Sequence, residues 1–312
     1  MIDCTDQYFR QFIRQISSKV YLYTEMITSH ALLKGDHKRL LEFDDIEHPI
    51  ALQIGGSDPS DLACVAKLGE SFNYDEINLN VGCPSPRVQA GRFGACLMKE
   101  PETVARCVDA MIKVVNIPVT VKTRIGVDEL DSYEAFYHFI KTVSQAGCNV
   151  FIVHARKAWL KGLSPKQNRT IPPLDYDFVH QIKRDLPHLE IIVNGGINDL
   201  DINNQFSSLD GMMIGREAYS NPYHLINVDE HFYEEKSKGR SRLDIINAFA
   251  PYAEKSLRKG LPVSILLKHI YGLSHGLSGG SAWRRHCAEL IKSYSKTKPS
   301  YSDFISRFPK AC

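Results

Sequence analysis

Residues that could carry out chemistry stand where predicted strands end, and the first of them is Cys83. A short apolar strand over Ile77–Val81 is followed by Gly82, Cys83 and Pro84. A thiol at the C-terminal end of a buried strand, held between a glycine and a proline, is well placed to face a ligand. The alternative is a structural core cysteine, since free cysteine is among the most buried residue types. The local sequence leaves both interpretations open.

The same arrangement recurs along the chain. Apolar strands are expected near residues 22, 51, 79, 120, 152, 192 and 213, with helices between them. These strands read as apolar runs without polar alternation, which is typical of a parallel sheet covered on both faces. In a (β/α)8 TIM barrel the active site is built at the C-terminal strand ends. The sequence therefore predicts such a barrel, because its strands end in polar or glycine residues: Gln53, Cys83, Lys122, His154, Asn194 and Gly215.

The first barrel strand is missing from this count, because seven strands are found and eight are needed to close the barrel. It should precede the first helix, where only Met1–Cys4 remain. We therefore expect Met1 to be an internal methionine with a strand encoded upstream of it. After Pro222 the pattern changes to helices joined by glycine-containing turns, which predicts a small helical bundle. The predicted division is a catalytic barrel over residues 1–232 and a helical domain over residues 233–312.

Glycine-rich segments end the last two predicted strands. They are Asn194-Gly195-Gly196 and Gly215-Arg216. Loops at these two strand ends of a barrel commonly bind phosphate through glycine amides, and Arg216 would add positive charge. Alone, the first segment is equally a turn signal. Both segments at the appropriate strand ends favour a phosphate-bearing ligand.

Three donors are predicted for the middle of the barrel mouth. Gln53, Lys122 and His154 offer an amide, an ammonium and an imidazole. These groups suit an electron-rich heterocycle, and a lysine near N1 stabilises a reduced flavin. Together with the phosphate loops they favour flavin mononucleotide (FMN). Alternatives stay open, because Lys122 is also compatible with a Schiff base or an ion pair, and His154 with a core histidine. The sequence has no GxGxxG, so a nicotinamide donor would visit the flavin instead of occupying its own domain.

The charge distribution is uneven, although the composition is that of an ordinary globular protein. The chain has 312 residues, of which 43% are hydrophobic and 24% charged. Residues 251–312 contain eleven Lys or Arg and three acids, a net charge of +8, so residues 1–250 carry −6 of the overall +2. A basic C-terminal segment on an acidic body suggests a polyanionic partner. A solvated helical face is the alternative.

The eight cysteines are widely spaced and none forms a CxxC pair. We therefore expect free thiols in a reducing compartment and no zinc or iron–sulfur site. No apolar run approaches the ~18 residues of a membrane span, and the N-terminus has no targeting pattern. The expectation is a cytoplasmic protein without a metal, a membrane contact or a stable protein partner, and a monomer by default.

The stretch NVGCPSPRVQAGRFGA resembles the active-site motif of the tRNA-dihydrouridine synthases. The similarity extends through LQIGGSDP, VKTRIG, HARKAWLKGLSPKQNR, NGGI and IGREAYSNP, and so covers nearly the whole chain. It is greatest to the A-type subfamily, which acts on D-loop uridines 20 and 20a. The resemblance implies an FMN-binding barrel, a C-terminal helical domain that binds tRNA, and NADPH as the reductant. It places FMN contacts at Met1, Gln53, Lys122, His154, Asn194, Gly195, Gly196, Gly215 and Arg216.

The resemblance also implies a reaction. Reduction of the uracil 5,6 bond requires a hydride at C6 and a proton at C5, and Cys83 would donate that proton as the general acid. A thiol suits this role because it is mostly protonated at neutral pH. The base must leave its stack to reach the flavin. Asn80 would hold the edge of the flipped uracil, with capping of the backbone as the alternative.

Two basic segments are the expected tRNA contacts. Lys166 and Arg169 lie in the loop that follows His154, and Arg284 and Arg285 follow a tryptophan in the helical domain. Basic side chains beside a barrel mouth can grip phosphates. For the two arginines, an ordinary helix surface is the alternative.

Two other functions are compatible with these residues. One is a flavin-dependent oxidoreductase of a free pyrimidine, similar to dihydroorotate dehydrogenase, although the basic C-terminal segment argues against it. The other is a non-catalytic tRNA-binding protein, which would result if the incomplete barrel does not hold FMN. A colourless protein that still binds tRNA would favour the second.

Overall fold

A computed structural model gives the fold of residues 1–198, 200, 203–236 and 239–309. The chain divides into two compact units. The first contains Met1, Tyr23–Phe43 and His48–Gly215. The second contains Ile2–Leu22, Asp44–Glu47 and the chain from Arg216 onward.

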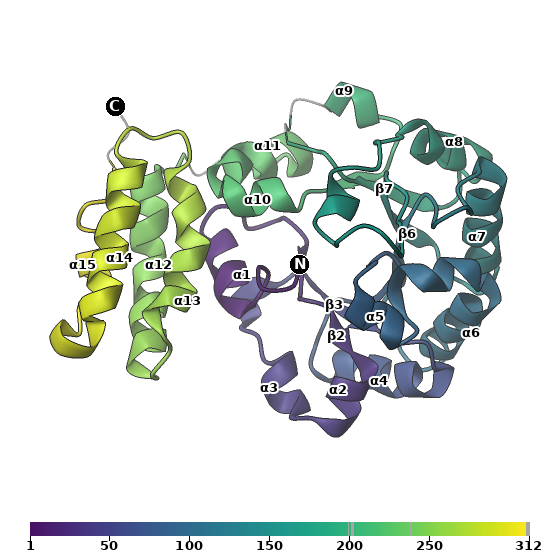
Figure 1. Cartoon of the computed structure of the whole chain (residues 1–312), viewed down its shortest axis with the longest axis horizontal. Helices are drawn as coiled ribbons and strands as arrows, with labels where there is room; N and C mark the ends of the chain where they lie inside the picture. Colours follow the sequence, from purple (N-terminus) through teal and green to yellow (C-terminus); the bar gives the residue numbers. More distant parts are fainter. Residues whose placement is uncertain (199, 201–202, 237–238, 310–312) are drawn as a thin grey trace. The chain divides into compact units, whose positions relative to one another are not determined.

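The first unit is built on one sheet with the strand–helix order of a (β/α)8 TIM barrel (Figure 1). The strand order is β1-β3-β4-β5-β6-β7-β8, and β2 also pairs with β3. Every ladder from β2 to β8 is parallel. The strands are β1 (Leu22–Tyr23), β2 (Ile27–Thr28), β3 (Ile50–Gly55), β4 (Glu76–Asn80), β5 (Val119–Arg124), β6 (Val150–His154), β7 (Glu190–Asn194) and β8 (Gly211–Met213).

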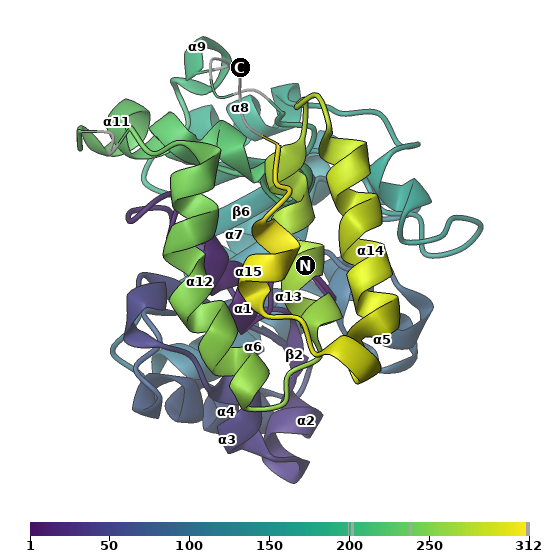
Figure 2. The same cartoon turned by 90° about the vertical axis from the view of Figure 1, so that its left-hand side faces the viewer.

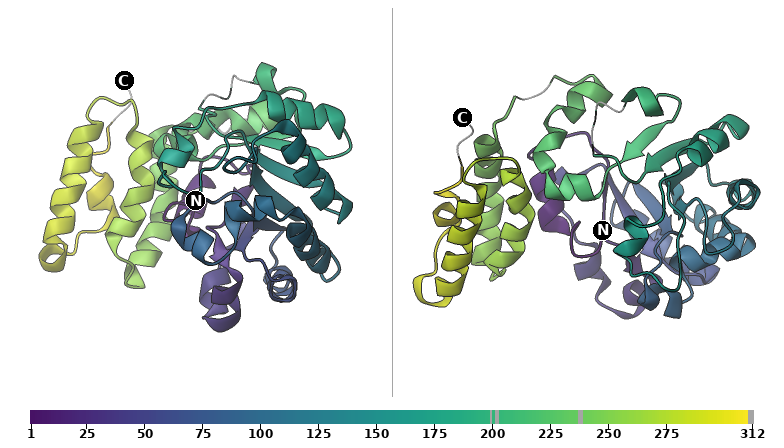
Figure 3. Two further views of the ribbon diagram at one scale, coloured as in Figure 1. Left: turned by 45° about the vertical axis from the view of Figure 1, so that its right-hand side comes forward. Right: turned by 45° about the horizontal axis from the view of Figure 1, so that its top comes forward.

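Helices α4, α6, α7 and α8 cover one face of this sheet, and Figure 3 shows the same layers from two further directions. They form because their apolar residues recur at helical spacing; Val104, Cys107, Val108 and Met111 of α6, for example, are all buried. The helices of the first unit are α2 (Ser29–Lys34), α3 (His37–Leu41), α4 (Pro59–Ser71), α5 (Pro86–Ala90), α6 (Pro101–Ile112), α7 (Tyr133–Gln145), α8 (Asp177–Asp185) and α9 (Asn203–Phe206), with 3-10 turns η2 (Gly94–Lys99) and η3 (Gln167–Arg169).

The expected strand count is met with one change. The strand predicted near residue 22 is two short strands, β1 and β2, and both pair with β3. They therefore occupy one position beside β3, and β3 to β8 occupy the next six. Among the described residues, no ladder joins β8 to β1.

The prediction that the strands lack polar alternation is wrong for β4. This strand reads Glu-Ile-Asn-Leu-Asn, and all five residues are buried. The side chain of Ile77 points toward helix α4, because a Cβ on Gly69 would meet it at 2.6 Å. Successive strand residues point to opposite faces, so Glu76, Asn78 and Asn80 face the inner side of the sheet. The alternation does not mark an exposed face, because the polar side chains are buried as well, in hydrogen bonds described below.

The second unit is helical, and Figure 2 shows its C-terminal helices α12 to α15. Its helices are α1 (Gln7–Ile13), α10 (Arg216–Ser220), α11 (Val228–Tyr233), α12 (Arg242–Arg258), α13 (Val263–Ile270), α14 (Gly280–Thr297) and α15 (Tyr301–Ile305), with 3-10 turns η1 (Asp45–Glu47), η4 (Pro222–Asn227) and η5 (Tyr271–Ser274). The predicted bundle therefore exists, with α15 as an unpredicted addition.

The compact units divide after Gly215, whereas the sequence placed the boundary at residue 232. The N-terminal helix α1 belongs to the second unit because its aromatic side chains complete that core. The rings of Phe9 and Tyr219 lie 5.2 Å apart, and those of Phe12 and Phe249 lie 5.6 Å apart. A buried ion pair of 2.5 Å between Arg10 and Glu47 adds to this packing. No helix in the described ranges is both long and apolar enough to span a membrane.

Candidate functional site

The C-terminal ends of β3 to β7 bring five of the predicted site residues to one edge of the sheet. Pairing aligns Asn80 of β4 with Lys122 of β5, and His154 of β6 with Asn194 of β7. Gln53 of β3 is hydrogen-bonded to Asn80, and Cys83 lies three residues after it. Residues from five successive strands therefore meet at the edge where barrel enzymes build their active sites.

Lys122 is the cation at the centre of this edge. Its Nζ donates to Oδ1 of Asn194 at 2.9 Å, and the amide nitrogen of Asn194 donates to the carbonyl of Met213 at 2.7 Å. The pKa of Lys122 is lowered to about 8, mainly by burial and also by nearby Arg124, whereas a Cys83 thiolate would raise it. Within the described residues no carboxylate forms an ion pair with Lys122. The ion-pair alternative is thus not what the structure shows, and this cation suits an anionic or electron-rich ligand.

Cys83 lies on the loop after β4 and is only partly buried. Its N–H donates to Oδ1 of Asn80 at 3.0 Å, and its carbonyl accepts from the N–H of Ala95 at 2.9 Å. The buried-core alternative describes Cys107 and Cys148, where burial raises the pKa to about 12. It does not describe Cys83, which is close enough to Lys122 to affect the pKa of that residue. The catalytic role of Cys83 stays a prediction.

Asn80 uses both ends of its carboxamide inside the protein. Oδ1 accepts from the N–H groups of Gly82 and Cys83 at 3.1 and 3.0 Å, and Nδ2 donates to Oε1 of Gln53 at 3.0 Å. The side chain is 8% exposed. The structure therefore shows the backbone cap that the sequence left as the alternative. A contact with a uracil edge stays a prediction.

The glycines after β7 have the geometry of a close-approach loop. Gly195 and Gly196 have φ angles of 110° and 70°, which disfavour any residue with a Cβ. A Cβ on Gly195 would lie 2.4 Å from Cδ2 of His154, so the buried imidazole packs directly on this glycine. The hydroxyl of Tyr176 donates to the carbonyl of Gly195 at 2.6 Å. These contacts bury Gly195, whereas Gly196 is exposed. The burial of His154 agrees equally with the core-histidine alternative.

The end of β8 is lined by the first residue of the chain. The sulfur of Met1 lies 3.4 Å from the position that a Cβ on Gly215 would take. Met1 and Gly215 belong to the first unit, whereas Arg216 is exposed and begins α10 in the second. Contacts of all three with FMN stay predictions.

Arg124 is a site residue that sequence analysis did not identify. It is 4% exposed, and its Nε donates to the carbonyl of Gly82 at 2.9 Å. Its Nη1 donates to the carbonyls of Lys157 at 3.1 Å and Asn168 at 2.9 Å. Burial is the main cause that lowers its pKa to about 10. The signal was present, because Lys122 and Arg124 are two residues apart on one strand and so share a face.

The basic loop between β6 and α8 carries the exposed side chains of Lys166 and Arg169. Its shape depends on the buried Asn168, whose Oδ1 accepts from the N–H of Trp159 at 2.7 Å and whose Nδ2 donates to the Trp159 carbonyl at 2.9 Å. Gln89 of α5 joins this loop to the Cys83 loop, donating to the carbonyls of Pro84 and Leu160, each at 2.8 Å. The loop that carries the predicted thiol and the loop that carries two predicted tRNA contacts are therefore one connected structure.

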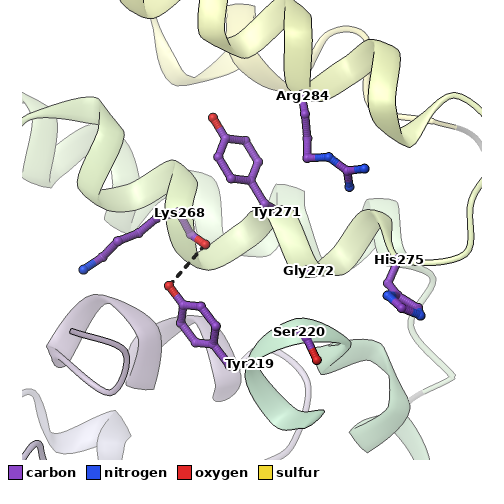
Figure 4. Close-up of a pocket in the computed structure, with 7 residues that line it drawn as sticks. All are labelled: Tyr219, Ser220, Lys268, Tyr271, Gly272, His275 and Arg284. Carbon is purple, nitrogen blue, oxygen red and sulfur yellow. Dashed lines mark hydrogen bonds between the residues drawn. The ribbon is translucent and has the colours of Figure 1, made fainter. Parts of the chain in front are cut away.

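Arg284 and Arg285 are exposed on α14, while Trp283 is 1% exposed and donates to the carbonyl of Phe304 at 2.8 Å. The tryptophan is thus a core residue and the arginines form a helix surface. Arg284 also lines a cavity of about 300 Å³ in the second unit (Figure 4). The other residues around this cavity are Tyr219, Ser220, Lys268, Tyr271, Gly272 and His275. Contact of Arg284 and Arg285 with tRNA stays a prediction.

The described residues contain no group of three or more His, Cys, Asp or Glu side chains that could hold a metal ion. The seven cysteines among them are free thiols.

Curated relatives cover most of this chain. It is 56% identical over 292 residues to the tRNA-dihydrouridine(20/20a) synthase of Shewanella oneidensis, which covers 93% of this chain and 86% of the relative. It is 53% identical to the synthase of the same name from Synechocystis, over 91% of this chain and 86% of the relative. For the Escherichia coli K12 synthase of that name the identity is 52%, over 93% and 84%.

Solved structures support the fold. A 2-naphthoyl-CoA reductase in complex with 2-naphthoyl-CoA matches with a TM-score of 0.55 over 74% of this chain and 47% of that chain, at 12% identity. The family model described as "Dihydrouridine synthase (Dus)" matches residues 1–308. With that match and relatives above 50% identity, this chain belongs to the dihydrouridine synthase family, a family of flavin-dependent enzymes.

Proposed function

We propose that this protein is a tRNA-dihydrouridine synthase that binds FMN, uses NADPH as its reductant, and reduces uridines 20 and 20a of the tRNA D-loop. The names of its relatives support the reaction and the positions. The observation that carries the proposal is the placement of a partly exposed thiol, Cys83, beside the partly buried cation Lys122 near the strand ends.

The residues at this edge fit FMN. Lys122 is a partly buried cation without a carboxylate partner among the described residues, and Gln53 on β3 and His154 on β6 are further donors. The positive φ angles of Gly195 and Gly196 leave backbone that a phosphate could approach closely. Met1, Asn194, Gly215 and Arg216 complete the proposed contacts. Reduced FMN, when bound, supplies a hydride to C6 of the uracil.

The protein supplies the proton and the geometry. The Sγ of Cys83 donates a proton to C5 as the general acid, from the loop that Asn80 and Arg124 hold in place. Lys122 stabilises the negative charge of the reduced flavin. The target base must be flipped out of its stack to reach this position, and Asn80 would contact its edge.

The basic residues position the tRNA. Lys166 and Arg169 on the loop joined to Cys83 through Gln89, and Arg284 and Arg285 on α14, are proposed phosphate contacts. We assign the catalytic function to residues 1–232 and tRNA binding to residues 233–312. The protein acts in the cytoplasm as a monomer.

The test is Cys83→Ala, with Cys96→Ala as the matched control. Cys96 is also partly buried, but its Sγ donates to the carbonyl of Phe93 at 3.1 Å, outside the proposed machinery. Purified proteins are given unmodified tRNA, NADPH and FMN, and dihydrouridine is mapped by mass spectrometry. We expect Cys83→Ala to retain the flavin colour and to lose about 10²–10⁴ in reduction rate, and Cys96→Ala to keep the wild-type rate.

Three results would contradict the proposal. Full activity of Cys83→Ala would remove the thiol from the mechanism. Turnover of free uracil in preference to tRNA would indicate a free-pyrimidine oxidoreductase. A colourless wild-type protein that binds tRNA without reducing it would indicate a non-catalytic binding protein. Mapping of dihydrouridine in tRNA from cells that lack the gene identifies the positions.

A further inference from the structure

A continuous chain of side-chain hydrogen bonds runs along the inner face of the sheet, from the floor of the strands to the Cys83 loop. We call it the barrel chain. Its members, in order from the loop inward, are Asn80, Gln53, Asn78, Thr120 and Glu76.

Each link of the barrel chain is short. Asn80 donates to Oε1 of Gln53 at 3.0 Å, and Gln53 donates from Nε2 to Oδ1 of Asn78 at 2.9 Å. Asn78 donates from Nδ2 to the hydroxyl of Thr120 at 2.8 Å, and that hydroxyl donates to Oε1 of Glu76 at 2.5 Å. All four bonds therefore point in the same direction, from the loop toward the carboxyl group.

This direction is determined by the loop end. The N–H groups of Gly82 and Cys83 can only donate, so the oxygen of Asn80 must face them and its nitrogen must face Gln53. The same reasoning then orients Gln53 and Asn78 in turn. Thr120 must accept from Asn78, so its own proton is directed at Glu76. The orientation of every amide in the chain follows from the bonding pattern alone.

The chain is almost completely shielded from water. Asn78 and Thr120 are 0% and 1% exposed, Glu76 is 7% exposed, and Gln53 and Asn80 are each 8% exposed. Hydrogen bonds in such an interior are stronger than in water, and aligned bonds polarise one another. Reversing a single amide would place two oxygens or two nitrogens face to face at both of its ends. One orientation of Gln53 is therefore strongly favoured.

We propose that the barrel chain positions the site: the loop end sets the orientation of each carboxamide, and Thr120 and Asn78 are positioning residues that anchor the Gln53 carboxamide for the cofactor and the Asn80 cap for the Cys83 loop. The inference rests on the proposed FMN site for its first half only, because the link to the Cys83 loop is independent of any ligand. One N–H of Gln53 remains beyond the bond to Asn78, and the chain presents it toward an acceptor on the ligand.

The first test removes one hydroxyl from the middle of the chain. Thr120→Val has a similar volume but lacks the proton donor and the acceptor, whereas Thr120→Ser retains both. Thr123→Val is the matched control, because Thr123 is 0% exposed on the same strand. Among the described residues its hydroxyl bonds only the carbonyl of Arg124, at 3.3 Å. We expect FMN to bind Thr120→Val about tenfold more weakly, the equivalent of about 1.4 kcal/mol, and to bind Thr120→Ser and Thr123→Val like wild type.

A double-mutant cycle separates positioning from general loosening of the barrel. If Thr120 acts through Gln53, the Thr120→Val change should have no further effect on FMN affinity in a Gln53→Ala background. Equal tenfold losses in both backgrounds, or unchanged affinity in Thr120→Val, would overturn the proposal. Thr120→Ala replaces the valine variant if the latter does not fold.

The second test needs no flavin and so stands apart from the proposed function. Alkylation rates are measured by peptide mass spectrometry in flavin-free protein, with the exposed Cys64 as the internal reference for Cys83. Disrupting the chain loosens the Asn80 cap, so the Cys83-to-Cys64 rate ratio should rise about threefold or more in Thr120→Val and stay unchanged in Thr123→Val. An identical ratio in wild type and Thr120→Val would overturn the inference even if the protein reduces tRNA. A raised ratio in a protein that does not reduce tRNA would support the inference and contradict the proposed function.

Discussion

Lys122→Met is expected to make the flavin-free protein more stable at pH 7 while abolishing reduction. Burial lowers the pKa of Lys122 to about 8 from its usual 10.5, and the ammonium has a single described hydrogen-bond acceptor, Asn194. A cation held in this environment costs folding free energy at neutral pH. Methionine has a similar length and no charge, so it removes that cost.

The magnitude follows from the pKa difference. The folded pKa lies below the unfolded one, so between pH 8 and 10.5 the unfolded chain holds more protons and stability rises with pH. The full shift corresponds to about 3 kcal/mol below pH 8. Losing the hydrogen bond to Asn194 offsets about 1 kcal/mol of this gain in stability. We therefore expect Lys122→Met to be about 2 kcal/mol more stable at pH 7, a rise of roughly 4–8 °C in melting temperature, and to lose this advantage by pH 10.5.

Thermal denaturation of flavin-free wild type and Lys122→Met at pH 7, 9 and 10.5 measures the effect. Lys113→Met is the control, because Lys113 is exposed and its 2.6 Å pair with Asp109 is solvent-screened, so its change should be small at every pH. A Lys122→Met protein that is destabilised equally at all three pH values would refute the reasoning. It would mean that the charge of Lys122 is not held at a cost.

Three further substitutions test the loops around the site. Arg124→Lys keeps the charge but reaches fewer of the three carbonyls, so tRNA reduction should fall about tenfold or more with FMN still bound, as separate rate and flavin titrations would show. Gly195→Ala places a Cβ 2.4 Å from the ring of His154 at a φ of 110°, so FMN affinity by fluorescence titration should fall at least tenfold; unchanged affinity would exclude this loop from the flavin site. Asn168→Ala removes the bonds that shape the basic loop, so the KM for tRNA should rise more than kcat falls, whereas a change in kcat alone would place Asn168 in the chemistry.

Local sequence patterns were sufficient for most strands and long helices. The strand predicted near residue 152 is Val150–His154, and the helix expected before it is α7, which begins after its N-cap Ser132. Such elements follow from apolar periodicity and capping residues that lie within a few positions of each other. Short elements were missed where turn residues dominate. Helix α5 is an example, because Ser85 and Pro86 read as part of a turn although they are its cap and first residue.

The sequence alone also determined which residue types reach the mouth of the barrel. His154 ends its strand, Cys83 follows a strand end, and Gln53 and Lys122 lie two residues before theirs. Parallel strands bring such ends to one edge. This conclusion needs only the order of strands along the chain, so it did not depend on contacts between distant residues.

Only the tertiary structure decided what those side chains do to each other. The sequence left Asn80 with two roles, and the choice depended on whether Gln53, 27 positions away, accepted its amide. It assigned no role to Arg124, whose partners Gly82 and Asn168 are 42 and 44 positions away in sequence. A buried polar group is stable only with partners, and the identity of those partners is set by which strands become neighbours. The local sequence therefore determines which type of side chain stands at each position, whereas the assembled sheet determines which hydrogen-bond partners it meets.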